Sequence, residues 1–138
     1  MKRVAFVCVH NSCRSQMAEG WARELGKGIL KVSSAGTEDY PEIKPLAVKV
    51  MGEVSIGMSD QYPKVLEEIE APDILITMGC GADCPWVPNY HREDWGLDDP
   101  SGGPIEDYRV TRDIIKGKVL ELIERVTTGD LSHIKDNK

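Results

Sequence analysis

Apolar residues along this chain occur in two patterns, short continuous runs and longer stretches with helical spacing. The continuous runs predict buried strands at residues 3–8, 31–35 and 74–78, with a brief fourth strand near residues 93–95. Stretches in which apolar residues recur every three or four positions predict helices at residues 17–25, 45–51, 67–70 and 106–128. Because strands and helices alternate, the sequence predicts an α/β fold: a small four-stranded parallel sheet with helices on both faces.

The length and charge of the chain narrow its setting. Its 138 residues suit one domain, residues 1–138, that ends in a polar tail at 129–138. The longest apolar run is far too short to cross a bilayer, and the N-terminus lacks a secretory pattern, so we expect a cytoplasmic protein. The net charge of -6 disfavours nucleic acid and anionic membranes as partners, and we expect a monomer.

The first predicted strand ends at a cysteine, and an arginine follows six residues later. Between Cys8 and Arg14 lies a polar turn that joins the strand to the next helix. Such a turn can aim several backbone N–H groups at one point, and the helix dipole favours an anion there. Arg14 adds a planar set of donors that matches a tetrahedral oxyanion, and the same positive field favours the nucleophilic thiolate of Cys8. This pattern indicates a nucleophile and an anion receptor in one loop.

Four cysteines also allow a metal site. Cys8 with Cys13, and Cys80 with Cys84, have spacings within the loose range of zinc ligands. Arg14 and the helix start fit an anion better than a cluster of thiolates, so we expect no bound metal or other cofactor. In a cytoplasm that keeps thiols reduced, such cysteines are more often catalytic than structural.

The run from Cys8 to Trp21, Cys-Val-His-Asn-Ser-Cys-Arg-Ser-Gln-Met-Ala-Glu-Gly-Trp, resembles the signature loop of thiol-dependent arsenate reductases of the thioredoxin-coupled type. These enzymes share a fold with low-molecular-weight protein tyrosine phosphatases. The runs at 33–36 and 93–100 match as well, and the likeness extends from about residue 3 to about residue 126. The loop itself is common to both groups, whereas residues 15–21 and the paired Cys80 and Cys84 favour the reductases. The resemblance therefore implies a single catalytic domain with arsenate as substrate and phosphate or sulfate as mimics.

The resemblance also implies roles for individual residues. Cys8 is the nucleophile, Arg14 binds the oxyanion, Ser15 hydrogen-bonds the thiolate and Asn11 braces the loop. The residues expected to bind substrate are Val9, His10, Asn11, Ser12, Cys13, Arg14 and Ser15. In the reductases, the asparagine shares a cation-sensitive network with the residues that match Glu19 and Ser34; a further acidic member falls near Pro63 and Lys64, neither of which is acidic.

A proton donor is expected opposite the nucleophile, because an oxygen that leaves the oxyanion must be protonated. Asp98 and Asp99 lie in the loop after the fourth strand, and the residues alone leave the choice between them open. The resemblance assigns the role to Asp99, just before Pro100. The tyrosine phosphatases usually carry an aromatic residue where this chain has Ser101, which favours the reductase interpretation.

The cysteine pair at 80 and 84 has a purpose in a reductase that it lacks in a phosphatase, because two electrons must come from thiols. On a helix, residues four apart have Cα atoms about 6 Å apart, within the usual disulfide range. We therefore expect a relay in which Cys80 attacks the Cys8 adduct and Cys84 then attacks Cys80. The resulting disulfide passes to an external thiol, either thioredoxin or a low-molecular-weight thiol.

Two other interpretations remain open on the sequence. The first is a low-molecular-weight protein tyrosine phosphatase that hydrolyses phosphomonoesters. The second is a protein of a different class, a non-catalytic oxyanion or metal sensor. Activity of variants at Cys8, Cys80 and Cys84 separates the three.

Overall fold

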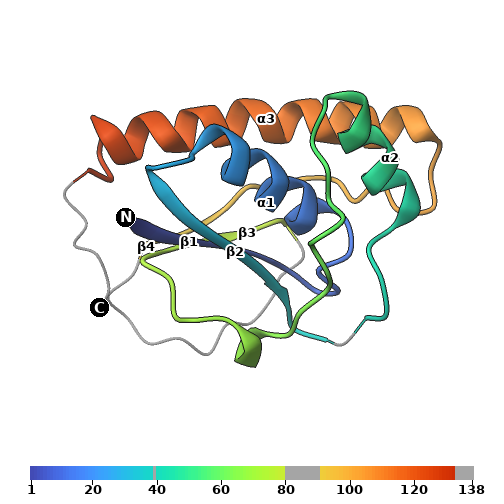
Figure 1. Cartoon of the computed structure of the whole chain (residues 1–138), viewed down its shortest axis with the longest axis horizontal. Coiled ribbons are helices and arrows are strands. Elements are labelled where there is room, and N and C mark those ends of the chain that lie inside the picture. Colours follow the sequence, from blue (N-terminus) through green and yellow to red (C-terminus); the bar gives the residue numbers. More distant parts are fainter. Residues whose placement is uncertain (39, 80–90, 133–138) are drawn as a thin grey trace.

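The computed structural model describes residues 1–38, 40–79 and 91–132 of the chain. Its four strands are β1 (Lys2–Cys8), β2 (Leu30–Gly36), β3 (Ile74–Thr77) and β4 (His91–Asp94). Its helices are α1 (Arg14–Leu25), α2 (Pro45–Glu53), the 3-10 helix η1 (Leu66–Glu68) and α3 (Ile105–Thr127). The predicted four-stranded parallel sheet is confirmed, with the strand order β2-β1-β3-β4 (Figure 1).

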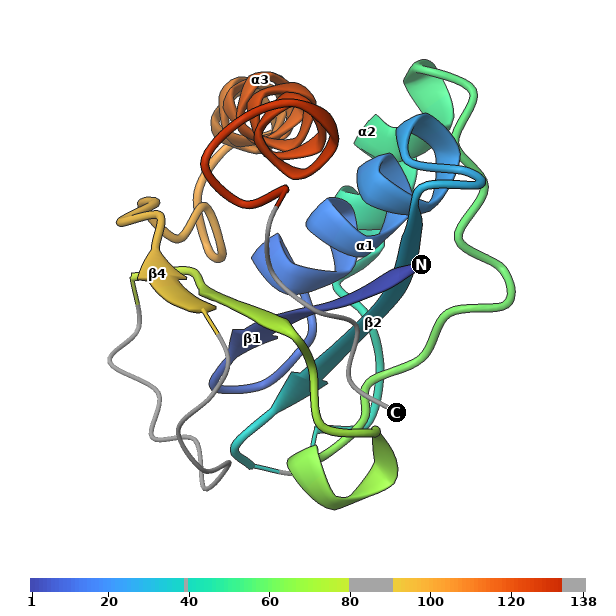
Figure 2. The same cartoon turned by 90° about the vertical axis from the view of Figure 1, so that its left-hand side faces the viewer.

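The two faces of the sheet are covered unequally. The helices α1, α2 and α3 all lie on one face, and η1 lies below the other (Figure 2). The connection from β2 to β3 runs first through α2 and then returns beneath the sheet through η1. The helical stretch predicted at 67–70 is therefore a single 3-10 turn at 66–68, which places Leu66 against the sheet.

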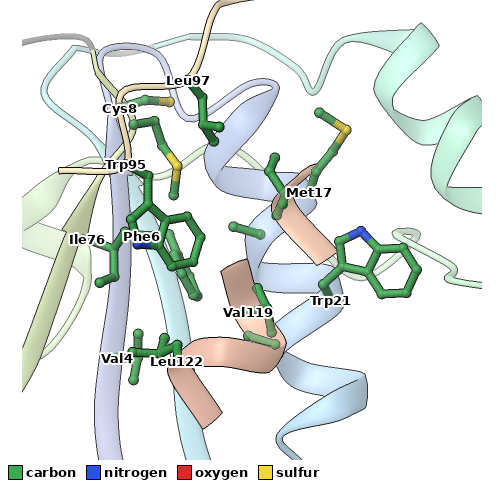
Figure 3. Packing of buried hydrophobic residues seen from close by; sticks show 14 of the residues in the cluster. Val4, Phe6, Cys8, Met17, Trp21, Ile76, Trp95, Leu97, Val119 and Leu122 are labelled. Atoms are coloured by element: carbon green, nitrogen blue, oxygen red, sulfur yellow. The ribbon is translucent and has the colours of Figure 1, made fainter. Parts of the chain in front are cut away.

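The side chains of the strands alternate between these two faces, as the pleat of a strand requires. Val4, Phe6 and Ile76 enter the large core beneath α1 and α3, where the rings of Phe6 and Trp95 lie 5.6 Å apart between centroids (Figure 3). Ala5, Val7 and Leu75 point the other way, into a small cluster with Ala35 and Leu66. This double burial explains why the central strands appear in the sequence as continuous apolar runs.

The register of the strands brings their carboxyl ends to one edge of the sheet. Cys8 lies opposite Gly36, and Thr77 lies between Val7 on one side and Asp94 on the other. Ligand sites of open α/β sheets lie beyond this edge. Within residues 1–38, 40–79 and 91–132, no helix is long and apolar enough to span a membrane.

Candidate active site

The loop between β1 and α1 wraps around the sulfur of Cys8. Asn11 adopts a left-handed backbone conformation with a φ of 55°, and its backbone N–H donates a hydrogen bond to Cys8 Sγ at 3.2 Å. A glycine at the end of β2 makes room for this turn, because a Cβ on Gly36 would lie 2.6 Å from the carbonyl oxygen of Val9. Cys8 as a residue is 5% exposed, and its side chain lies at the upper edge of the core, beside Leu97 (Figure 3). It is thus nearly dry but reachable from one side.

The hydroxyl group of Ser15, which the side chain of Asn11 orients, is a second donor to the same sulfur. Asn11 Nδ2 donates to Ser15 Oγ at 2.8 Å, and Ser15 Oγ lies 2.9 Å from Cys8 Sγ. Because the serine oxygen already accepts from the amide, its own proton is free to point at the sulfur. Cys8 Sγ then accepts two hydrogen bonds, one from the N–H of Asn11 and one from the hydroxyl of Ser15, an arrangement that suits a thiolate.

A buried polar network fixes the orientation of the Asn11 amide. Its Oδ1 accepts hydrogen bonds from Gln16 Nε2 at 2.9 Å and from the backbone N–H of Lys64 at 2.9 Å. Gln16 is held in turn by Gln61, whose Nε2 donates to Gln16 Oε1 at 2.8 Å. Since Oδ1 is committed to two donors, Nδ2 must face Ser15. The orientation of the nucleophile's partner is therefore set by residues well outside the loop.

Beside this network lies a buried carboxylate, that of Glu19. It accepts hydrogen bonds from Ser34 and Arg23, and Lys64 Nζ lies 3.6 Å from its Oε1. The lysine side chain is only 12% exposed. The resemblance predicted a cation-sensitive network at Asn11, Glu19 and Ser34; in this chain an ammonium group already faces the carboxylate.

Arg14 is held at the carboxyl edge of the sheet by two carbonyl groups. Its Nη1 donates to the carbonyl oxygens of Met78 at 2.6 Å and Leu97 at 2.7 Å, and its Nη2 lies 3.8 Å from Asp99 Oδ2. The guanidinium is thereby fixed beside Cys8. The N–H groups of Nε and Nη2 remain available to a ligand or to Asp99.

Asp94, at the end of β4, positions both of those carbonyls. Its Oδ1 accepts from Thr77 Oγ1 at 2.6 Å and from the N–H of Gly79 at 2.7 Å, and its Oδ2 accepts from the N–H of Gly96 at 3.0 Å. These hydrogen bonds, that from Thr77 foremost, hold the pKa of Asp94 below its usual value. An ionised Asp94 thus joins the two segments that hold Arg14.

A cavity of about 240 Å³ opens in front of Cys8. Its size suits a small oxyanion. The lining comes from the loop, from the start of α2 and from the segment after β4; it comprises Cys8, Val9, His10, Ser12, Cys13, Arg14, Tyr40, Lys44, Asp99 and Ser101. Of the predicted substrate-binding residues, Asn11 and Ser15 do not line this cavity but brace the loop from behind.

Two ionisable groups in the cavity have pKa values that differ from their ordinary ones. Burial raises the pKa of Asp99, but hydrogen bonds from Ser101 and the charges of Arg14 and Lys44 outweigh it and leave the pKa low. Burial, with the charges of Asp99 and Cys8, raises the pKa of the Cys13 thiol to about 12. Cys13 therefore stays protonated and does not compete with Cys8 as nucleophile.

The structure separates the two aspartates that the sequence left open. Both side chains are exposed, but only Asp99 lines the cavity, with its carboxylate beside Arg14, whereas Asp98 lies outside the lining. Cys80 and Cys84 lie outside the described residues, so their predicted relay is not tested. Three residues were missed by sequence reasoning: Tyr40, Lys44 and Asp94. The only local signal for Lys44 was its position before Pro45 at the start of α2.

Comparisons with known proteins agree with this geometry. The model of the family described as low molecular weight phosphotyrosine protein phosphatase matches residues 3–131. The chain is 42% identical over 132 residues to the glutaredoxin arsenate reductase of Synechocystis sp.; the matched region covers 92% of this chain and 100% of that protein. A solved structure of an arsenate reductase in the phosphate binding state has a TM-score of 0.82 at 41% identity, covering 91% of this chain and 99% of that one. The thioredoxin-dependent arsenate reductase of Corynebacterium glutamicum has a TM-score of 0.79 at 35% identity, covering 92% of this chain and 62% of that one.

Proposed function

This chain belongs to the low molecular weight phosphotyrosine protein phosphatase family, and on that premise we propose that it is an arsenate reductase, which converts arsenate to arsenite. The observation that carries the proposal is the sulfur of Cys8, which accepts from Asn11 N–H and Ser15 Oγ and faces a small cavity beside Arg14. The similarity to arsenate reductases over nearly the whole chain selects this reaction from those that such a site can perform.

The first step joins Cys8 to the substrate. The thiolate forms an S–As bond while the bond from arsenic to a hydroxyl group breaks, and the departing hydroxyl takes one proton and leaves as water. Asp99 lies on the cavity wall, and its protonated carboxyl group supplies that proton. Its pKa is low in the free site, and the negative charge of bound arsenate opposes ionisation of the carboxylate, so that binding favours the protonated, donating form.

The second step reduces the arsenic. A thiolate attacks the sulfur of Cys8, an S–S bond forms, and the S–As bond breaks with its electron pair on arsenic, which becomes arsenic(III). We assign this attack to Cys80. Cys84 then attacks Cys80, which releases the Cys8 thiolate and leaves a Cys80–Cys84 disulfide for an external thiol to reduce. Met78 and Gly79 lead from β3 toward this pair, and Met78 contacts Arg14 through its carbonyl.

The electron donor is an external thiol. One similar protein is a glutaredoxin arsenate reductase and another is thioredoxin-dependent, so both classes of donor occur among proteins that resemble this chain. We propose thioredoxin for this chain, because a Cys80–Cys84 disulfide is a substrate for a dithiol protein. A low-molecular-weight thiol coupled to glutaredoxin is the alternative, and both donors are consistent with a cytoplasmic location.

Phosphate ester hydrolysis is the second candidate, favoured by the family's description and by the fact that the Cys8 site needs no further cysteine for it. Ser101 lines the cavity where the tyrosine phosphatases usually carry an aromatic residue. Ser101 itself offers no ring against which a phenolic substrate could pack, which favours the inorganic substrate.

Turnover by purified protein tests the proposal. Arsenate-dependent consumption of NADPH is measured with thioredoxin and its reductase, and in parallel with glutathione, glutaredoxin and glutathione reductase. Wild-type protein is expected to turn over with at least one system, Cys8→Ser with neither, and Cys84→Ser not with the thioredoxin system. Hydrolysis of an aryl phosphate by Cys80→Ser and Cys84→Ser is the matched control. Absence of arsenate turnover in both systems with hydrolysis retained would favour the phosphatase, and full biological function of Cys8→Ser would favour a sensor.

A further inference from the structure

A lysine that no motif indicated lies at the mouth of the Cys8 cavity. We propose that Lys44 is a substrate-binding residue, whose ammonium group binds an outer oxygen of the tetrahedral oxyanion while Arg14 binds other oxygens of the same ion. This inference rests on the proposed function for the identity of the substrate. Its test uses phosphate binding, which is independent of arsenate reduction.

The position of Lys44 is fixed at both ends. Its backbone N–H donates to the carbonyl oxygen of Ser12 at 2.8 Å, which ties the start of α2 to the Cys8 loop. Its Nζ donates to the hydroxyl of Tyr40 at 2.6 Å. The ring of Tyr40 stacks on His10 of the same loop, with 4.6 Å between centroids. The ammonium group is therefore held near the loop and does not sweep freely through solvent.

The charge of Lys44 is available to a ligand. Across residues 1–38, 40–79 and 91–132, no carboxylate lies within ion-pair distance of its Nζ, although the chain has 23 acidic residues against 17 Lys and Arg. One N–H of the ammonium serves Tyr40, and two remain. The hydrogen bond to Tyr40 raises the pKa of Lys44, so the group is charged at neutral pH, where arsenate is an anion. A half-buried cation without a carboxylate partner beside a nucleophile is what an anion site requires.

The two cations of the cavity have different surroundings. Arg14 is 90% buried and commits one nitrogen to two carbonyls, which suits a fixed contact close to the reacting atom. Lys44 lies at the rim and faces both Asp99 and the entrance, since its charge contributes to the low pKa of Asp99. We assign to Arg14 the oxygens nearest Cys8 and to Lys44 an oxygen on the solvent side. Removing Lys44 should therefore weaken binding more than it slows the chemical step.

Calorimetry with inorganic phosphate and reduced protein tests this role directly. Lys44→Gln should weaken phosphate binding about tenfold, the factor expected for loss of one charge-assisted hydrogen bond, and Lys44→Arg should restore most of it. Lys49→Gln, at an exposed lysine of the helix that follows Lys44, is the matched control and should bind phosphate as the wild type does. Binding by Lys44→Gln within twofold of wild type would overturn the proposal.

A purely structural role for Lys44 predicts a different result. If the lysine acts only by holding Tyr40, then Tyr40→Phe, which removes the same hydrogen bond but keeps the ring, should weaken phosphate binding as much as Lys44→Gln does. We expect Tyr40→Phe to stay within about threefold of wild type. In the arsenate assay, Lys44→Gln should raise KM with kcat nearly unchanged, and a fall in kcat at constant KM would contradict the role. Absence of arsenate turnover by wild-type protein with tight phosphate binding would refute the proposed function and leave the Lys44 site intact.

Discussion

The hydroxyl group of Ser15 gives the sharpest test of how the loop activates Cys8. Ser15 is fully buried, and its Oγ lies 2.9 Å from Cys8 Sγ and 2.8 Å from Asn11 Nδ2. Ser15→Ala removes one of two donors to the sulfur. A hydrogen bond to a charged group is worth about 1.5–3 kcal/mol, and about 1.4 kcal/mol is a factor of ten. We therefore expect kcat/KM for arsenate to fall by about ten- to one-hundredfold.

Three measurements separate activation of the thiol from damage to the fold. The rate of Cys8 alkylation by iodoacetamide at neutral pH should fall in Ser15→Ala, whereas phosphate binding should persist because Arg14 is intact. Thermal unfolding should show a loss of about 1–3 kcal/mol, since Asn11 Nδ2 is left buried without an acceptor. Ser33→Ala, in a separate depression beside Lys31, is the control and should leave all three quantities unchanged. Wild-type alkylation and turnover in Ser15→Ala would refute the assigned hydrogen-bond direction.

A double-mutant cycle extends the same reasoning to Asn11. Glycine is the appropriate replacement there, because Asn11 has a φ of 55° and alanine would add backbone strain to the loss of the amide. Asn11→Gly and Ser15→Ala should be non-additive by about 0.5–3 kcal/mol, as expected for residues in one hydrogen-bond network. Strict additivity would mean that the amide does not act through the hydroxyl.

Three further predictions concern other charged groups. Asp99→Asn should lower kcat about 10²- to 10⁴-fold with phosphate affinity retained, as for loss of a general acid, and an unchanged kcat would remove Asp99 from that role. Hydrogen bonds from Arg109 lower the pKa of Glu53 to about 2, so its contribution to stability is present at neutral pH and is lost as pH falls from about 4.5 toward about 2. The melting temperature of wild type should thus exceed that of Glu53→Gln at pH 6 by more than at pH 3, and a constant difference would contradict this. Because Lys64 already faces the buried Glu19, turnover should be equal in potassium and sodium chloride, whereas Lys64→Met should turn over more slowly and regain activity in potassium.

The elements of the fold could be predicted because each is specified by nearby residues. Strands β1 and β3 are buried on both faces and therefore read as continuous apolar runs, and α3 has a clear helical period. The short η1 was harder, since three residues leave no period to detect. How the sheet's second face is covered depends on the path of the 54–73 connection, which local spacing does not encode.

The residues of the site also fall into two groups: some are close to one another in the sequence, and others meet only in the folded chain. Cys8, Asn11 and Ser15 lie within seven residues of one another, so a motif could reveal them. The contact between Arg14 and Leu97 spans 83 positions, and only the packed sheet brings them together. Asp94 and Lys44 are likewise far in sequence from the Cys8 loop, and only the folded chain brings them to the site. Asp94 stands inside the matching run at 93–100, but that run does not show that its carboxylate holds the backbone around Arg14, and nothing in the immediate sequence of Lys44 marks it as a cavity residue.

An anion site in a chain of net charge -6 follows from the distance over which charges act. At physiological ionic strength exposed charges are screened within about 8 Å, so acids elsewhere on the surface have little effect in the cavity. Among the described residues that line the cavity, Arg14 and Lys44 carry positive charge and Asp99 opposes them, and the start of α1 adds the positive end of its helix dipole. Several acids elsewhere are moreover paired with arginines, as Glu53 is with Arg109 and Arg112. The net charge therefore argues against a polyanionic partner across the whole surface, while the field at Cys8 favours a small dianion.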